Sequence, residues 1–207
     1  MSRYVSPLRE AQAAQTRLRI LDAAVAVFGA RGYSGTSLAQ IAKEAGVSLE
    51  TVKQNGPKAA LLLSAFGHAF SGADDDRPLH ERPVLDEVLA LPDDAFMTAW
   101  IAFVADGNAR VARLWPRLLD AALGDADVGA RLEALQANRR ADMSALIAQL
   151  RTRGLCRSPR DDAELAAAIS FLISPEGYAQ LVLESGLDHD AYRRWVLHAV
   201  ERVVLSA

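Results

Sequence analysis

Apolar residues recur every three or four positions along most of this chain, which is the spacing of one face of an α-helix. The first clear stripe lies before residue 30 and consists of Ile20, Ala24, Val27 and Phe28. The alternation of apolar and polar residues that marks a half-buried strand is hard to find. Alanine and leucine dominate the apolar residues, and both favour helix. The pattern therefore predicts an all-α protein.

Capping and breaking residues divide this pattern into separate helices. Ser37 precedes Gln40 by three residues, which is the spacing of a capping box at a helix N-terminus. Gly46 suits the left-handed backbone that ends a helix, and Ser48 caps the next one. Pro57 suits the first position of a fourth helix. The expected helices are residues 16–30, 36–45, 48–54, 57–69, 93–113, a short helix ending near 123, 128–153, 161–172 and 189–205.

Residues 71–83 separate the N-terminal helices from the rest of the chain. They include a run of three aspartates and two prolines and carry no apolar stripe, which is typical of a connection. We expect a three-helix N-terminal domain over residues 1–57 and a larger helical domain over residues 58–207, with the fourth helix bridging the two.

Charge is unevenly distributed between residues 1–70 and the rest of the chain. The whole chain has a net charge of −3, but residues 1–70 hold eight Lys and Arg against four Asp and Glu. The remaining residues hold 15 basic and 22 acidic side chains. A basic end on an acidic body suits a protein that offers one end to a phosphate backbone.

The two short helices on either side of Gly46 carry the most informative chemistry. A tight turn between them needs Gly46, because only a residue without Cβ takes a positive φ at little cost. The exposed sides of the third helix present donors and acceptors at a spacing that suits base edges in a DNA major groove. These residues are Glu50, Thr51, Lys53, Gln54 and Asn55. The pattern indicates a helix-turn-helix, and the alternative is a three-helix scaffold without a ligand.

The same stretch resembles the N-terminal domain of TetR-family regulators. The resemblance rests on apolar, glycine and capping positions that agree in register, namely Ile20, Leu21, Ala24, Phe28, Gly32, Tyr33, Thr36, Ser37, Leu38, Ile41, Ala42, Ala45, Gly46, Val47, Ser48, Thr51, Val52, Lys58, Leu61 and Leu62. A second run, from Ser174 to Leu197, resembles the C-terminal tail of one branch of that family.

This resemblance implies an all-helical homodimer whose recognition helices bind double-stranded DNA in two successive major grooves of a palindromic operator. It also implies that the larger domain binds a small-molecule effector, which alters the spacing of the two DNA-binding heads. Carried onto this sequence, residues 48–55 form the recognition helix, beginning at Ser48, and Ser37 and Lys58 contact phosphate.

The sequence departs from the family pattern directly after Val52. Many relatives carry Tyr-x-His-Phe there, whereas this chain reads Lys-Gln-Asn-Gly and is one residue shorter before Lys58. We expect Lys53 to replace the tyrosine hydroxyl as a phosphate contact, and Gly56 and Pro57 to make a tighter turn into the fourth helix. The alternative is a Lys53 that is merely solvated.

Aromatic and charged residues of the larger domain are candidates for an effector pocket, although such residues at helical spacing more often form plain core. The pocket candidates are Phe96, Trp100, Phe103, Arg110, Trp115, Met143, Phe171 and Tyr178, with Asn108 and Arg139 as further polar anchors. We expect the last two long helices to form a four-helix bundle between two copies. The candidate dimer residues are Ile169, Leu172, Tyr192, Trp195, Ala199 and Val203.

Catalytic and metal-binding functions find little support in the sequence. The four histidines show no metal-ligand spacing, the three aspartates at 74–76 are interpreted as a solvated loop, and we expect no metal or cofactor. No glycine-rich phosphate loop follows a strand, and no Gly-x-Ser-x-Gly motif is present. The favoured function is a ligand-responsive DNA-binding regulator, most simply a repressor. A helical adaptor with a degenerate DNA-binding head and a helical enzyme are the alternatives.

The expected location is the cytoplasm, without a membrane. The N-terminus lacks the apolar core of a secretory signal, and no run approaches the length of about 18 uncharged apolar residues that spans a bilayer. The single cysteine, Cys156, excludes an intramolecular disulfide and fits a reducing compartment. Because Arg153 and Arg157 flank it, a redox-sensing thiolate is a further alternative.

Overall fold

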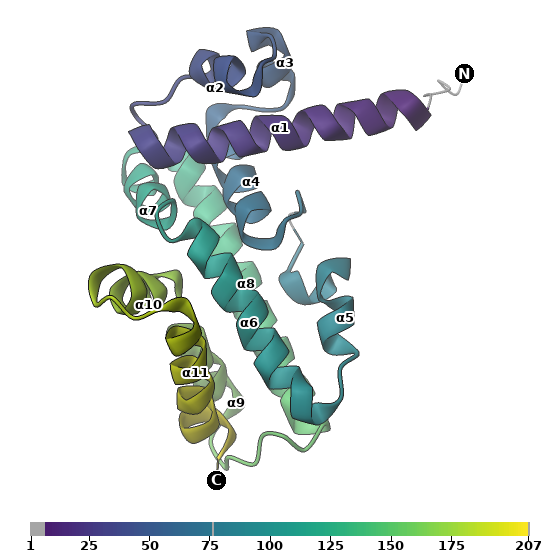
Figure 1. Ribbon diagram of the computed structural model, residues 1–207, viewed down its shortest axis with the longest axis vertical. Coiled ribbons are helices and arrows are strands. Elements are labelled where there is room, and N and C mark those ends of the chain that lie inside the picture. The colour runs from purple at the N-terminus through teal and green to yellow at the C-terminus, as the bar shows by residue number, and fades with distance from the viewer. Residues whose placement is uncertain (1–6, 76, 207) are drawn as a thin grey trace.

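The computed structural model describes residues 7–75 and 77–206, and within this part every regular element is a helix (Figure 1). The all-α prediction is therefore confirmed. Arg3 and Asp76, which entered the charge count and the expected aspartate loop, lie outside the described residues. The elements are α1 (Pro7–Arg31), α2 (Leu38–Ala45), α3 (Leu49–Gln54), α4 (Lys58–Ser71), η1 (Leu79–Glu81), η2 (Pro83–Leu85), α5 (Asp86–Leu89), α6 (Asp93–Val111), α7 (Trp115–Gly124), α8 (Ala126–Thr152), α9 (Asp162–Leu172), α10 (Pro175–Tyr178), η3 (Ala179–Glu184), α11 (His189–Val200) and η4 (Glu201–Leu205).

The helices form a small head on an elongated body (Figure 1). Helices α2 and α3 lie beyond α1, which crosses one end of the molecule, and α4 leads from the head into the body. Helices α6 and α8 run along the body in opposite directions, and α9 and α11 pack against them on the side away from α5. Helix α4 and the long helices α6 and α8 therefore connect the head with the far end of the body.

Two helical segments differ from the expected bounds. Helix α1 begins at Pro7 rather than near residue 16, and its first described turns are exposed, so no buried stripe marked them. Residues 175–184 form α10 and the π-helical turn η3, where no helix was expected. Pro175 occupies the first turn of α10, where a missing N–H leaves no intrahelical bond unmade.

The buried side chains form two cores, and α4 belongs to the first of them. That core joins α1, α2, α3 and α4 to Trp115 and Leu118 of α7 and to Val128 and Leu132 at the start of α8. The second core lies between α6, the remainder of α8 and the last helices, with Ile147, Tyr192 and Val196 among its members. The head thus shares its interior with part of the body.

A polar contact also ties the head to the body. The Tyr33 hydroxyl, in the turn between α1 and α2, donates a hydrogen bond of 2.7 Å to the Oδ2 atom of Asp125. Asp125 is the N-cap of α8, where its other oxygen accepts from the backbone N–H of Asp127 and Val128. Burial and the Asp125 carboxylate raise the pKa of Tyr33, and the hydrogen bond from Tyr33 lowers the pKa of Asp125. The phenol therefore stays protonated and donates throughout the neutral pH range.

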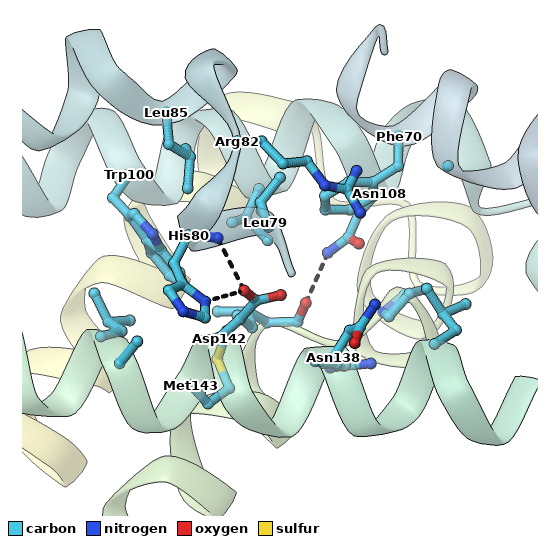
Figure 2. A pocket seen from close by; sticks show the side chains of 18 of the residues that line it. Phe70, Leu79, His80, Arg82, Leu85, Trp100, Asn108, Asn138, Asp142 and Met143 are labelled. Atoms are coloured by element: carbon cyan, nitrogen blue, oxygen red, sulfur yellow. Dashed lines mark hydrogen bonds and ion pairs between the residues drawn. The ribbon is translucent and has the colours of Figure 1, made fainter. Parts of the chain in front are cut away.

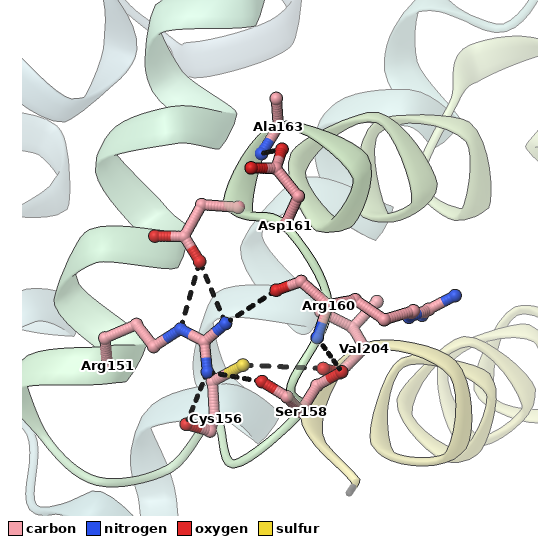
Figure 3. Close-up of polar contacts among 8 residues, drawn as sticks. Arg151, Cys156, Ser158, Arg160, Asp161, Ala163 and Val204 are labelled. Carbon is pink, nitrogen blue, oxygen red and sulfur yellow. Dashed lines mark hydrogen bonds and ion pairs between the residues drawn. The ribbon is translucent and has the colours of Figure 1, made fainter.

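The loop between α8 and α9 is held at the far end of the body by Arg151 (Figure 3). Its guanidinium donates to the Asp162 carboxylate and to the carbonyl oxygens of Ser158 and Arg160, at 2.6 Å and 3.1 Å for the two carbonyls. Cys156 lies in the same loop, buried, with its thiol directed at the Val204 carbonyl oxygen 3.4 Å away. The thiol of a redox sensor is accessible, and Cys156 has no such exposure.

One apolar stretch, residues 162–184, has the length and composition of a membrane span. In the structure this stretch is not one continuous helix, because α9 ends at Leu172 and α10 begins at Pro175. The inward side of α9 is buried in the second core through Leu165, Ala166 and Ile169. The stretch is weak evidence for a membrane segment, since core helices meet the same criterion.

Candidate functional site

Helices α2 and α3 form the expected helix-turn-helix. Ser37 caps α2 by accepting from the Gln40 backbone N–H, and the Gln40 side chain accepts from the Ser37 N–H at 2.7 Å. Gly46 ends α2 with φ of 65°, in the left-handed region that favours glycine. Ser48 then caps α3, its hydroxyl accepting from the Thr51 N–H at 3.0 Å. These local contacts fix the angle at which α3 leaves the turn.

Helix α3 turns one face to its own core and the other to solvent. Val52 is completely buried between α3 and the first core, whereas Glu50, Lys53 and Gln54 are exposed. Leu49 is also exposed on this side, and the sequence analysis did not single it out. An exposed leucine at this position offers an apolar contact of the type that reads the thymine methyl group. The only signal for it was its place directly after the capping serine.

Two of the candidate DNA contacts on α3 are partly used inside the head. The Thr51 hydroxyl shares a hydrogen bond of 2.8 Å with the Ser48 hydroxyl. Asn55 donates from its side-chain amide to the Thr51 carbonyl oxygen at 2.7 Å, and its own carbonyl accepts from Arg17 at 2.6 Å. Both residues are half-buried. They hold the end of α3 in place, so the exposed polar face consists mainly of residues 50, 53 and 54.

Lys58 is held by the head rather than extended into solvent. Its ammonium group donates to the carbonyl oxygens of Tyr33 and Thr36, at 2.9 Å and 3.0 Å, and lies 4.0 Å from the centre of the Tyr33 ring. These contacts occupy two of its three N–H donors. The structure thus gives Lys58 a structural role that the expected phosphate contact did not include. Lys43 and Lys53, in contrast, are exposed and make no ion pair or hydrogen bond within the described part of the chain.

The turn after α3 is the place where this chain is one residue shorter than the family pattern. Gly56 has φ of 126°, which L side chains rarely adopt, and Pro57 directly precedes the first residue of α4 as its N-cap. This tight connection replaces the longer aromatic segment of the family pattern. Pro57 lies one position earlier than expected, as the N-cap of α4 rather than its first residue.

The Ser48 cap of α3 is expected to contribute to the stability of the head. Replacing Ser48 by alanine is expected to lower the free energy of unfolding by about 1 kcal/mol, because the Thr51 N–H loses its acceptor. Urea denaturation followed by circular dichroism measures this change. The control is Ser34→Ala, since Ser34 is exposed and makes no hydrogen bond within residues 7–75 and 77–206. Equal stability of the two variants would contradict the capping role.

The body contains a cavity of about 220 Å³ that reaches α4 (Figure 2). Its walls come from α4, α6, α8 and the segment between α4 and α6. Figure 2 shows Trp100 and Leu85 at one end, and Asn108 and Asn138 at the other. The cavity therefore has an apolar end and a polar end, and the polar end lies beside Phe70 of α4.

The segment between α4 and α6 covers this cavity. Leu79, Leu85 and Leu89 of the segment line it. His80 fastens the segment to α8, because its backbone N–H and its Nδ1 atom both contact the Asp142 carboxylate, at 2.9 Å and 2.7 Å. The stretch that the sequence analysis treated as a plain connection is thus part of the cavity wall.

The comparison with known families rests on the head. Residues 20–52 match the family model described as bacterial regulatory proteins, tetR family. This range runs from the buried half of α1 to Val52 of α3, and it contains the capped α2 and the turn at Gly46. The head of this chain therefore carries the DNA-binding domain that the tetR family model describes. No curated protein sequence matches the chain.

Solved structures share the TetR fold over nearly the whole chain. A TetR-family transcriptional regulator from Rhodococcus sp. is 19% identical, with 93% of this chain and 100% of that chain covered and a TM-score of 0.70. A transcriptional regulator from Saccharomonospora viridis, in complex with choline, is 20% identical over 94% and 100%, with a TM-score of 0.67. NalD of Pseudomonas aeruginosa, the secondary repressor of the MexAB-OprM multidrug efflux pump, is 21% identical over 93% and 98%, with a TM-score of 0.63. At these identities the likeness establishes the shared fold.

Within this TetR fold the pocket candidates fall into two groups. Trp100, Trp115 and Met143 line the cavity, as do Asn108 and Arg139. The others do not line it. Phe96 is buried under Arg153, Phe103 packs edge-on against Phe70, Arg110 donates to the carbonyl oxygens of Ala69 and Phe70, Tyr178 packs against Tyr192, and Phe171 is 76% exposed. Helical spacing identified large residues but not which side of each helix faced the cavity.

The candidate dimer residues also fall into two groups, one buried in the single chain and one at least partly exposed. Ile169 and Tyr192 are buried in the second core of the single chain. Leu172 and Ala199 are half-buried, whereas Trp195 and Val203 remain exposed. The stripe on α11 thus has an inner side that fills the core of one chain and an outer side available to a partner.

Clusters of His, Cys, Asp or Glu side chains hold metal ions in proteins. No group of three His, Cys, Asp or Glu side chains that would hold a metal ion lies within residues 7–75 and 77–206. The TetR family is one of transcriptional regulators.

Proposed function

We propose that this protein is a cytoplasmic, homodimeric repressor that binds a palindromic operator and releases it when a small molecule binds in the body. In this proposal residues 1–57 contact DNA, and residues 58–207 bind the effector and the second copy. The observation that carries it is the exposed polar face of α3, with Glu50, Lys53 and Gln54 outward and Val52 buried.

Charge and geometry of the head support DNA binding. Lys43 in the last turn of α2 and Lys53 in the last turn of α3 are exposed, and residues 1–70 carry the basic excess. Neutralising phosphates releases condensed counterions, which favours binding at low salt. A single head would bind weakly at physiological salt, and a dimer doubles the phosphate contacts.

The position of the cavity supports control by an effector. Phe66, Gly67 and Phe70 of α4 line it, and α4 begins four residues after the end of α3. A molecule in the cavity therefore contacts the helix that carries the DNA-binding head. Its effect on DNA affinity is limited to the difference between its affinities for the two arrangements of α4. The relative from Saccharomonospora viridis was solved with choline, which is a bound small molecule in a protein of the same fold.

Exposed apolar side chains support the homodimer. Seven large apolar residues are left exposed in the described part of the chain, and four of them belong to the last helices. These four are Phe171, Leu183, Trp195 and Val203. Exposed apolar groups gathered in one region of a monomer mark an interaction surface, and two-fold symmetric dimers are the commonest assembly.

The test is selection of bound fragments from random-sequence DNA, followed by gel-shift titration at several salt concentrations. The proposed function predicts a palindromic consensus and a steep salt dependence. Lys53→Met is expected to reduce the slope of log K against log salt by about two per dimer, because each copy loses one phosphate contact. Arg157→Met, which removes an exposed charge from the loop after α8, is the control and keeps the wild-type slope.

Two results would contradict the proposal. A protein that selects no sequence and shows no salt dependence would instead be an adaptor with a degenerate head. A protein that selects DNA but shows the wild-type salt slope after Lys53→Met would retain the function and lose the assignment of Lys53 to phosphate.

A further inference from the structure

The polar end of the cavity is built on the C-terminal end of α9. Asn108 of α6 donates from its side-chain amide to the Ile173 carbonyl oxygen at 2.8 Å. Arg139 of α8 donates to the Ser170 carbonyl oxygen at 2.5 Å. Both side chains also line the cavity. Their positions are therefore fixed by backbone acceptors, and the Asn108 side chain also contacts the Tyr192 hydroxyl.

Two buried polar atoms of residues that line the cavity have no hydrogen-bond partner among the described residues. One is the Oδ1 acceptor of Asn108, whose side chain is buried, and the other is the Nε1–H donor of Trp115. Trp115 packs against Phe66 of α4, with 5.4 Å between ring centres, and lines the cavity. An unsatisfied buried polar atom costs free energy, so a ligand group that accepts a hydrogen bond from the Trp115 Nε1–H is favoured here.

Arg139 gives this end a positive charge without a matching carboxylate. Within residues 7–75 and 77–206 the guanidinium makes no ion pair; Glu176 acts on it only from a distance. Burial lowers the pKa of Arg139, which reflects the cost of keeping a guanidinium away from water. An anion beside it would offset that cost and form charge-assisted hydrogen bonds.

The acid in the cavity wall is already engaged. Asp142 accepts from the backbone N–H and contacts the ring of His80, so its charge is occupied in fastening the covering segment. Asp142 is the one carboxylate in the lining, and Arg139 faces the cavity from the same helix. A cationic ligand would therefore find no uncommitted carboxylate among the described residues of the wall.

We propose that the effector is a small amphipathic anion, with an apolar body between Trp100 and α4 and a carboxylate-type group held by Arg139 and the Trp115 Nε1–H. This inference rests on the proposed function, because it concerns the effector of the same cavity. The volume of about 220 Å³ equals that of roughly seven water molecules in the liquid, which suits a compound of roughly ten non-hydrogen atoms. Choline, with which the relative from Saccharomonospora viridis was solved, is a cation, so the proposed effector differs from it in charge.

The test compares three probes with the same aromatic body and different charge: phenylacetate, 2-phenylethanol and phenethylammonium. Binding to the full-length protein is followed by tryptophan fluorescence, because Trp100 and Trp115 line the cavity. Phenylacetate is expected to bind about tenfold more tightly than the alcohol, and the ammonium compound more weakly than either. Equal affinities, or tighter binding of the ammonium compound, would overturn the proposal on the wild-type protein alone.

Variants then assign the site. Arg139→Gln is expected to remove the preference for phenylacetate over 2-phenylethanol, while Arg131→Gln, an exposed arginine on the same helix, retains it. Val104→Phe narrows the cavity and is expected to weaken all three probes. Preference for the anion that survives Arg139→Gln would place the anion elsewhere. The measurement contains no DNA, so it distinguishes a wrong effector class from a failure of DNA recognition.

Discussion

Replacing Leu21 by alanine is expected to lower the free energy of unfolding by about 3–5 kcal/mol and to abolish DNA binding at 37 °C. Leu21 lies on α1 and is completely buried in the core that joins the head to α7 and α8. The loss combines the transfer free energy of the deleted methyl groups with a cavity that the surrounding helices fill only in part. Chemical denaturation measures the stability, and gel-shift titration measures the DNA affinity.

The chain offers a matched control for this substitution. Leu123, near the end of α7, is 90% exposed, and Leu123→Ala is expected to change stability by less than about 0.5 kcal/mol. A similar loss in both variants would show that the effect comes from helix propensity or the unfolded state rather than from the buried core.

Replacing Trp195 by glutamate is expected to raise the dimer dissociation constant at least about 100-fold. Trp195 on α11 is 45% exposed in the single chain, and it is one of four exposed large apolar residues in the last helices. In a two-fold symmetric interface the change occurs in both copies, and each buries an unpaired carboxylate. Sedimentation equilibrium measures the change, and operator affinity should fall in parallel.

Leu123→Glu is the control for this variant, because it adds the same charge at an exposed leucine on α7. If Trp195→Glu remains dimeric at the concentration where the wild type is dimeric, the outer side of α11 is not the interface. Loss of helical content in Trp195→Glu would mean that the residue supports the fold of one chain; circular dichroism decides this point.

The head was the most predictable part because its signals are local. A capping box, a left-handed glycine and a second capping serine each act over three or four residues, and Ser37, Gly46 and Ser48 take the expected roles. The outward direction of Gln54 followed from the same local pattern. Lys58 shows the limit, since its acceptors lie 22 and 25 residues earlier in the chain and no short pattern identifies them.

The sequence predicted the helices of the body but not the residues that line its cavity or its exposed outer side. An apolar stripe on α11 predicts burial but does not indicate whether the same chain or a partner buries each residue. Tyr192 and Trp195 were therefore both predicted in the dimer interface, although Tyr192 is buried in the single chain and Trp195 is exposed. The cavity depends on where α6 and α8 pass each other and on a segment with short, irregular turns. Leu79 and Leu85 in that segment are separated by Pro83 and follow neither helical nor strand spacing.

The Tyr33–Asp125 hydrogen bond and the shared core limit how such a regulator can be re-engineered. A chimaera that replaces residues 1–57 with the head of a relative would retain Leu118 and Val128 as half of an interior whose other half had changed. It would also remove the phenol donor to the N-cap of α8 unless the grafted head carries a tyrosine at the position of Tyr33. Exchange of DNA specificity therefore calls for grafting the outward residues of α3 alone, with the native α1, α7 and α8 left intact.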